Sequence, residues 1–290
     1  MRSFLWFIGL IAAGFVAMAV FTYPAWLAVS PVLDAPFHRV GSRLGMLFLL
    51  VGFILMARRL GLADRASLGY ALPRPLFLRE LGIGFVLGLA LMLPIVGLMI
   101  ALDLRVLKPG LVLDAATLAP LLLKGVLAGF AVAFIEETFL RGAMHTGIAR
   151  ESGPRAAILL TAAVYAAFHF IGRFRIPREE VHAGSGLDLV AGSLRAFAEP
   201  ALIADAFLCL MAVGVLLGIV RHLTGNIAAC IGLHAGWVTV ITAVRATSRR
   251  DPSNELSWLL SRFDGMVGWL VLAWTVVIGL ALIGFYRRRA

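Results

Sequence analysis

The chain has 290 residues, of which 61% are apolar and only 14% are charged, and its formal net charge at pH 7 is +10. Soluble domains are about 45–50% apolar and about 25% charged, so this composition excludes a disordered chain and argues against a soluble globular enzyme. We expect a protein that crosses the membrane several times. The positive charge requires no nucleic acid, because basic residues at helix ends fix the topology and contact anionic lipid headgroups.

Apolar runs long enough to cross a bilayer recur along the whole chain. A span needs about 20 apolar residues, and eight such runs are predicted, near residues 4–29, 43–57, 80–102, 118–140, 156–172, 201–221, 226–246 and 265–286. The first run is too long for the apolar part of a signal peptide, so we count it as a span. No linker or internal repeat divides the chain. The predicted fold is therefore all-α, a transmembrane helical bundle forming a single integral membrane domain over residues 1–290.

Basic residues at the span ends predict the orientation. Eight spans place both termini on the same side, and the basic residues divide evenly between the two sides. The tight clusters at Arg58–Arg59 and Arg287–Arg289 directly follow span ends, where the positive-inside signal is strongest. We therefore expect both termini in the cytoplasm. Almost all basic residues are Arg, which indicates a GC-rich prokaryotic genome, so the expected location is the cell (inner) membrane.

The end of the fourth span carries three charged residues, Glu136, Glu137 and Arg141. Glu137 and Arg141 are four residues apart with the Glu first, so they stack on one helix face as a favourable ion pair. Glu136 lies about 100° around the helix and is the less neutralised carboxylate, which suits a general base. Charges at membrane depth usually face the protein interior and have a function. The alternative is a charged cap at the interface.

Two later spans contribute histidines. Tyr165 and His169 share a helix face at the end of the fifth span, where His169 is either an aromatic-belt residue or a site residue. His234 lies about 12 Å along a helix that starts near Asn226, and this depth argues against a belt role. Three separate helices thus supply Glu136, His169 and His234 to one interior, which is the composition of a catalytic or metal-binding site.

Other polar and small residues of the spans receive structural interpretations. Gly232, Ala235 and Gly236 flank His234 and allow another helix to approach closely. Asn226 follows Thr224-Gly225 and is predicted to cap a helix. Structural or interfacial positions are also expected for Lys124, Asp205, Cys209 and Cys230. His38, His145, His182 and His222 fall in predicted loops or at span edges and are not assigned to the site.

Three short motifs together resemble the CPBP family, which comprises CAAX prenyl endopeptidases of the Rce1 type and bacterial bacteriocin-processing or Abi proteins. The motif residues are, in chain order, Glu136, Glu137, Arg141, Tyr165, His169 and His234. Their order, their spacing and the frame of eight spans all agree with the family. The resemblance implies a protease core over about residues 118–246.

The resemblance implies an intramembrane endopeptidase with a defined division of roles. Glu136 and His169 would activate a water molecule, and His234 would bind the oxyanion or a metal. Glu137 and Arg141 belong to the same predicted site. A divalent metal such as zinc, held by Glu136, His169 and His234 with an open fourth position, is compatible with these residues, and so is a metal-free Glu/His pair.

The sequence departs from the family at two positions. Tyr165 stands where Phe is usual, which is conservative, and Val238 stands where the family usually has Asn or Asp. The loss at Val238 removes a donor or ligand and favours a second hypothesis, a catalytically inactive membrane scaffold. A third hypothesis, a proton-relay transporter, is disfavoured because the sequence lacks the paired broken helices of a transport site.

The expected substrate is a peptide or a membrane-anchored protein. The loop at 173–200 is a solvated face or a gate.

Overall fold

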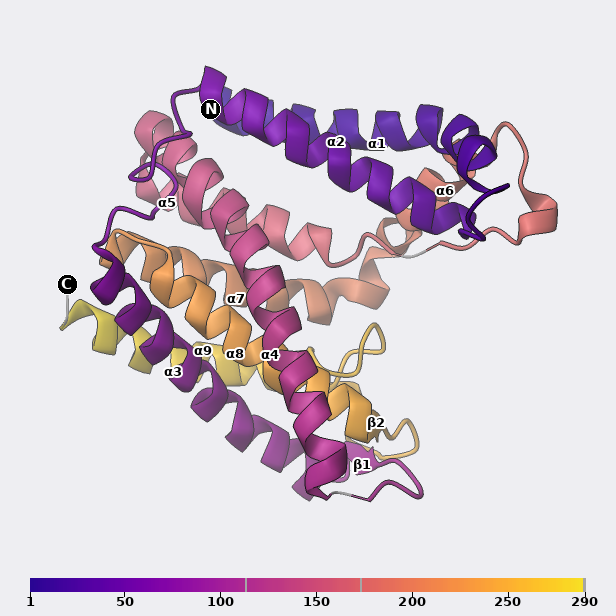
Figure 1. The fold of residues 1–290 in the computed structure, drawn as a ribbon. Helices are drawn as coiled ribbons and strands as arrows, with labels where there is room; N and C mark the ends of the chain where they lie inside the picture. The colour runs from indigo at the N-terminus through magenta and orange to yellow at the C-terminus, as the bar shows by residue number, and fades with distance from the viewer. Residues whose placement is uncertain (113, 173, 289–290) are drawn as a thin grey trace. The chain divides into compact units, whose positions relative to one another are not determined.

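The computed structural model describes residues 1–112, 114–172 and 174–288, and nearly all of its regular structure is helical (Figure 1). The α-helices are α1 (Arg2–Val29), α2 (Phe37–Arg59), α3 (Arg74–Ala101), α4 (Ala115–Glu137), α5 (His145–Phe168), α6 (Ser185–Ser193), α7 (Pro200–Thr224), α8 (Ala228–Thr247) and α9 (Trp269–Arg287). The shorter elements are the π-helical turn Thr138–Met144, the 3₁₀ turns Arg178–Glu180, Arg195–Ala198 and Ser257–Leu259, and the strands β1 (Arg105–Leu107) and β2 (Ser248–Arg250). The predicted all-α class is confirmed.

Each predicted span coincides with a helix. In the described part of the chain, seven continuous helical stretches are long and apolar enough to cross a membrane, and the stretch Ala115–Phe168 contains two of the predicted spans. The helical backbone of this stretch breaks at Gly153 (φ 82°, ψ 166°), directly before Pro154. Proline lacks an N–H and disfavours the α conformation in the residue before it, so the break falls at this dipeptide. The chain is a multi-pass membrane protein.

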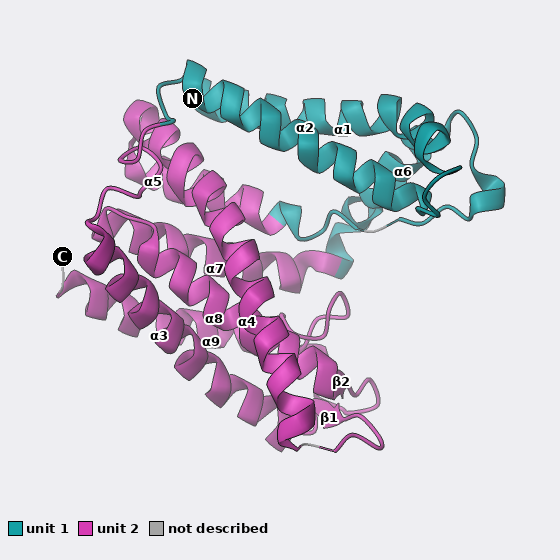
Figure 2. Ribbon diagram, in the orientation of Figure 1, with its two compact units in different colours: residues 1–63, 167–202 teal, residues 64–166, 203–290 magenta. Residues whose placement is uncertain are grey.

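Two compact units make up the chain, and Figure 2 colours them separately. Unit 1 comprises residues 1–63 and 167–202, and unit 2 comprises residues 64–166 and 203–290. A single membrane domain over residues 1–290 stays a prediction.

Unit 1 is built around the helix pair α1 and α2, with α6 packed against α1. Its buried cluster consists of Trp26, Phe37 and Leu189, one from each of the three helices. The Trp26 indole Nε1 donates to the Ala35 carbonyl at 3.1 Å, so the polar atom of this buried ring is satisfied by the loop between α1 and α2.

In unit 2, α8 packs against both α3 and α4. Glycines allow the close approach: a Cβ added at Gly88 of α3 would lie 2.6 Å from the Leu233 carbonyl oxygen, and one at Gly129 of α4 would lie 2.6 Å from the Ala235 carbonyl oxygen. On α8, a Cβ at Gly236 would lie 2.7 Å from the Phe85 carbonyl oxygen. The predicted close approach at the glycines of this helix is therefore confirmed, as expected for packing without a hydrophobic driving force.

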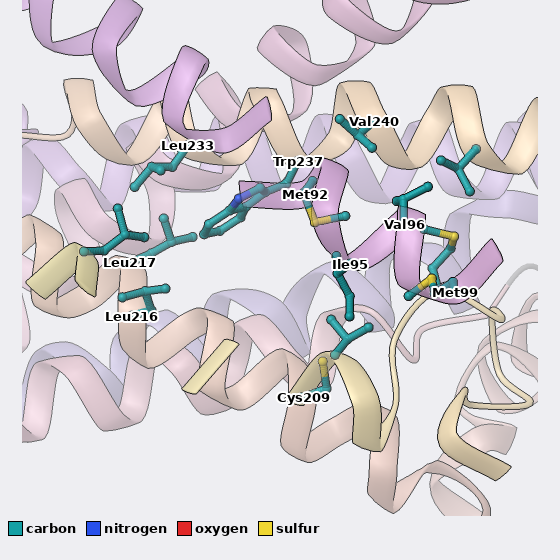
Figure 3. Close-up of a cluster of buried hydrophobic side chains, with 14 of the residues drawn as sticks. Met92, Ile95, Val96, Met99, Cys209, Leu216, Leu217, Leu233, Trp237 and Val240 are labelled. Atoms are coloured by element: carbon teal, nitrogen blue, oxygen red, sulfur yellow. The ribbon is translucent and has the colours of Figure 1, made fainter. Parts of the chain in front are cut away.

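The main apolar core of unit 2 includes side chains of α3, α7 and α8. Figure 3 shows Leu233 and Trp237 of α8 facing Leu217 of α7 and Met92 of α3. Beyond the membrane-spanning parts, β1 pairs antiparallel with β2, with Arg105 opposite Arg250, and joins the end of α3 to the end of α8. These contacts fix α8 along its length.

Candidate active site

The charged motif, which consists of Glu136, Glu137 and Arg141, lies where α4 passes into the π-helical turn Thr138–Met144. α4 starts at the Asp114 cap, whose carboxylate accepts from the Thr117 N–H at 2.8 Å, and it ends at Glu137. The Glu137 side chain is fully buried, and its Oε1 accepts from Nη1 of the equally buried Arg141 at 3.1 Å. The predicted ion pair is confirmed. A buried guanidinium neutralises a buried carboxylate at low cost only when both are well hydrogen-bonded.

His234 joins this pair from α8. Its Nδ1 lies 2.8 Å from Oε1 of Glu137, and its Nε2 lies 4.0 Å from Oε2 of Glu136. The histidine is 3% exposed, whereas the side chain of Glu136 is 34% exposed. The predicted interior position of His234 is confirmed. The two adjacent glutamates therefore differ in environment: Glu137 is buried and paired, and Glu136 faces accessible space.

The aromatic ring of Tyr165 forms one wall of the site. Cζ of Arg141 lies 4.7 Å from the centre of this ring, in cation–π contact. The ring also meets the imidazole of His234 edge to face, with the centroids 5.9 Å apart and the planes at 82°. Tyr165 thus contacts both partners of Glu137, which restricts the orientation of Arg141 and of His234.

Tyr70, Gly214 and Arg221 also contribute contacts to the site, and none of the three was predicted. Nη2 of Arg141 donates to the Gly214 carbonyl at 3.2 Å, and Nε of Arg221 donates to the Arg141 carbonyl at 2.9 Å. The Tyr70 hydroxyl donates to Thr138 Oγ1 at 2.5 Å, because the Thr138 hydroxyl itself donates to a carbonyl of α4. Burial raises the pKa of Tyr70. No periodicity could have found these residues, because each lies more than 60 positions from its partner.

Among the residues expected to lie outside the site, some have the predicted position and one, His145, does not. Oδ1 of Asn226 accepts from the Ala228 N–H at 2.9 Å, so Asn226 contacts the helix start as expected, but the N-cap residue itself is Ile227. Cys209 and Cys230 are buried free thiols. His145 differs from its predicted position in a loop or at a span edge, because it opens α5 and is only 5% exposed. The helix continues through the charged motif as a π-helical turn, so this histidine is carried into the protein interior.

His169 lies in unit 1, in the turn that directly follows α5, and is partly buried. Its neighbours Phe168 and Ile171 line a pocket of about 270 Å³ together with apolar side chains of α1 and α2. Unit 2 brings together the other four predicted site residues, Glu136, Glu137, Arg141 and His234. The roles predicted for all five remain predictions.

The predicted zinc site would need enough protein ligands within reach of one ion. Catalytic zinc takes three protein ligands, and unit 2 alone supplies two of the predicted three, Glu136 and His234. Over residues 1–112, 114–172 and 174–288, no group of three or more His, Cys, Asp or Glu side chains is arranged to hold a metal ion. His169, the third predicted ligand, lies in unit 1, and zinc stays a prediction.

Comparison with known proteins identifies one region. Residues 118–240 match the family model of type II CAAX prenyl endopeptidase Rce1-like proteins. No curated protein and no solved structure matches the chain. The matched region contains the charged motif, Tyr165, His169 and His234. The match covers less than half of the chain, and it confirms the resemblance to CAAX prenyl endopeptidases of the Rce1 type that the motifs predicted.

Proposed function

We propose that the protein is an intramembrane endopeptidase that hydrolyses a peptide bond of a membrane-associated protein or peptide. The match to a protease family model and the membrane-spanning helices support this coarse assignment. In the proposed mechanism, Glu136 and His169 activate a water molecule, and His234 polarises the scissile carbonyl. The proposed location is the cell (inner) membrane, with both termini in the cytoplasm.

The observation that carries the proposal is the different burial of two adjacent glutamates around one histidine. Glu137 Oε1 is already paired with Arg141, so it acts as a carboxylate and accepts a hydrogen bond from Nδ1–H of His234. This bond orients the ring so that Nε2 faces Glu136. A buried carboxylate on one imidazole nitrogen both orients the ring and stabilises its protonated form. The side chain of Glu136 is 34% exposed and, in the proposed reaction, is the one that meets water and substrate.

The positions of Glu136 and His234 suggest the following steps for hydrolysis of the peptide bond. Glu136 removes a proton from water as the water oxygen attacks the carbonyl carbon, and Nε2–H of the protonated His234 donates to the oxyanion that develops. When the carbon–nitrogen bond breaks, Glu136 delivers its proton to the leaving amine. This sequence uses only side chains of the chain itself.

New protein N-termini in native membranes test the proposed activity. Wild-type cells are compared with cells carrying Glu136→Gln at matched expression, and the control is Glu255→Gln, which changes an exposed glutamate of the β2–α9 connection. We expect a set of N-termini that disappears with Glu136→Gln and persists with Glu255→Gln. Those termini would also identify the substrate.

Val238 favours a second candidate, a catalytically inactive scaffold of the same family, because this position lacks the usual Asn or Asp. A scaffold keeps its phenotype when Glu136 becomes Gln, since the neutral amide has the same shape. Unchanged N-termini together with an unchanged phenotype would therefore replace the protease proposal with the scaffold.

A further inference from the structure

The helix that carries the charged motif is wider than an α-helix directly after Glu137. Thr138–Met144 is a π-helical turn of seven residues, and it contains Arg141. Such turns are rare and occur frequently at functional sites. A π turn replaces the regular i→i−4 bonding, so its backbone groups depend more on partners from other elements. Besides its ion pair with Glu137, Arg141 is therefore held by contacts from outside its own helix.

Arg221 of α7 supplies one of these contacts. Its Nε donates to the Arg141 carbonyl at 2.9 Å, and the residue is 8% exposed. Burial of a guanidinium is costly unless the charged group is hydrogen-bonded. Seven residues earlier, on the same face of α7, the Gly214 carbonyl accepts from Arg141 Nη2 at 3.2 Å. α7 therefore holds Arg141 at both its backbone and its side chain.

From Arg141 the contacts continue to the candidate active site. Arg141 Nη1 donates to Glu137 Oε1 at 3.1 Å, and the same oxygen lies 2.8 Å from His234 Nδ1. The Tyr165 ring packs against both Arg141 and His234. A shift of the Arg141 backbone would therefore displace the carboxylate that orients the imidazole.

We propose that Arg221 is a positioning residue of this site, which acts by holding the π-helical turn so that Glu137 keeps His234 oriented. Its catalytic effect rests on the proposed protease function. Its effect on the turn does not, because the hydrogen bond to the Arg141 carbonyl exists whether or not the site hydrolyses a peptide.

The test compares three variants of the full chain in lipid nanodiscs. Arg221→Met removes the donor and keeps the apolar stem, Arg221→Lys keeps a charged donor of different geometry, and Arg155→Met is the control, because Arg155 is an exposed arginine of the same unit. We measure kcat and KM on the substrate found through Glu136→Gln, and amide hydrogen exchange over residues 138–148.

We expect Arg221→Met to lower kcat about 10- to 100-fold, the effect of a displacement on the order of 1 Å, with KM nearly unchanged. Exchange over residues 138–148 should become faster. Arg221→Lys should give an intermediate kcat, and Arg155→Met should match the wild type in both measurements.

Two outcomes would overturn the inference. One is unchanged exchange over residues 138–148 in Arg221→Met. The other is a loss of folded protein in which the remaining folded fraction keeps the wild-type kcat, since Arg221 would then serve only stability. If the wild type cleaves nothing but Arg221→Met still exchanges faster, the protease function fails and the role of Arg221 in holding the turn stands.

Discussion

α8 and α9 belong to the same unit and are 20 and 19 residues long, but they lie in opposite environments. In the most apolar 18-residue stretch of α8, 72% of the residues are buried, against 33% in α9. α8 is nevertheless the less apolar of the two. Large apolar side chains of α9, such as Val277 and Leu280, are exposed, whereas α8 places glycines against α3.

The difference shows how a membrane protein inverts the arrangement of a soluble one. Lipid is as apolar as a leucine side chain, so large apolar residues gain little from helix contacts, and small or polar residues occupy the interior. Of these two helices, α8 carries the histidine of the candidate site. It is the more buried helix, and its mean hydropathy is the lower of the two.

Loss of the α8 histidine should have the largest effect. We expect His234→Ala to lower kcat about 10²- to 10³-fold, the range for removal of an oxyanion donor. The control is Val277→Ala on α9, which changes a side chain that is 61% exposed and should leave kcat unchanged. Cleavage of the substrate identified through Glu136→Gln is the measurement. A His234→Ala protein with wild-type kcat would remove α8 from the mechanism.

The glycines of the two helices should respond differently to an added methyl group. A Cβ at Gly236 of α8 would lie 2.7 Å from the Phe85 carbonyl oxygen, whereas nothing lies within 4 Å of one at Gly284 of α9. We expect Gly236→Ala to lower the free energy of unfolding by about 1–3 kcal/mol, and Gly284→Ala to leave it unchanged or slightly raised. Denaturation in mixed micelles measures both, and equal effects would contradict the contrast.

Asn226, the residue before the N-cap Ile227, contacts the first N–H of α8 through its side chain, whereas α9 starts after Gly268 without a side-chain cap. We expect Asn226→Ala to cost about 1 kcal/mol of stability, because the Ala228 N–H loses its acceptor. Asn226→Asp keeps an acceptor and should retain most of the stability. The same denaturation experiment compares the two variants. If both behave alike, the hydrogen bond does not stabilise the helix.

A charged cap should add a small dependence on pH that the neutral Asn226 side chain at the start of α8 lacks. Hydrogen bonds from Thr117 lower the pKa of Asp114 at the start of α4. A carboxyl with a lowered pKa stabilises the fold above its unfolded value, about 3.9, and this contribution is lost as the pH falls through the folded value. Asp114→Asn should remove this part of the acid sensitivity, measured as stability against pH. An unchanged profile would show that other carboxyl groups dominate.

The sequence is informative wherever the physics is local. Helical periodicity and spacing predicted the Glu137–Arg141 pair, because the two residues are four positions apart on one helix. The depth of His234 followed from its distance to Asn226 at the helix start, since rise per residue fixes depth. Both predictions needed only one helix each.

Contacts between distant elements could not be predicted in this way. Arg221 was counted only among the basic residues at span ends, and its donation to Arg141 depends on how α7 packs against the π-helical turn. The inward position of His145 has the same origin, because a π turn has no periodic signature in the sequence. A signal that the sequence does provide is Arg221 itself, a charged residue near the end of a long apolar stretch that follows Asp205.

The π-helical turn also makes the site sensitive to chain length. A π-helical turn, bonded i→i−5, holds more residues per turn than an α-helix, so deletion of one residue within Thr138–Met144 would remove the turn while leaving the later helix on nearly the same face. The effect would be local: the Arg141 carbonyl would move relative to Arg221, and Gly142 would move from the Leu68 carbonyl against which it lies. The number of residues in this stretch is therefore constrained together with their identity.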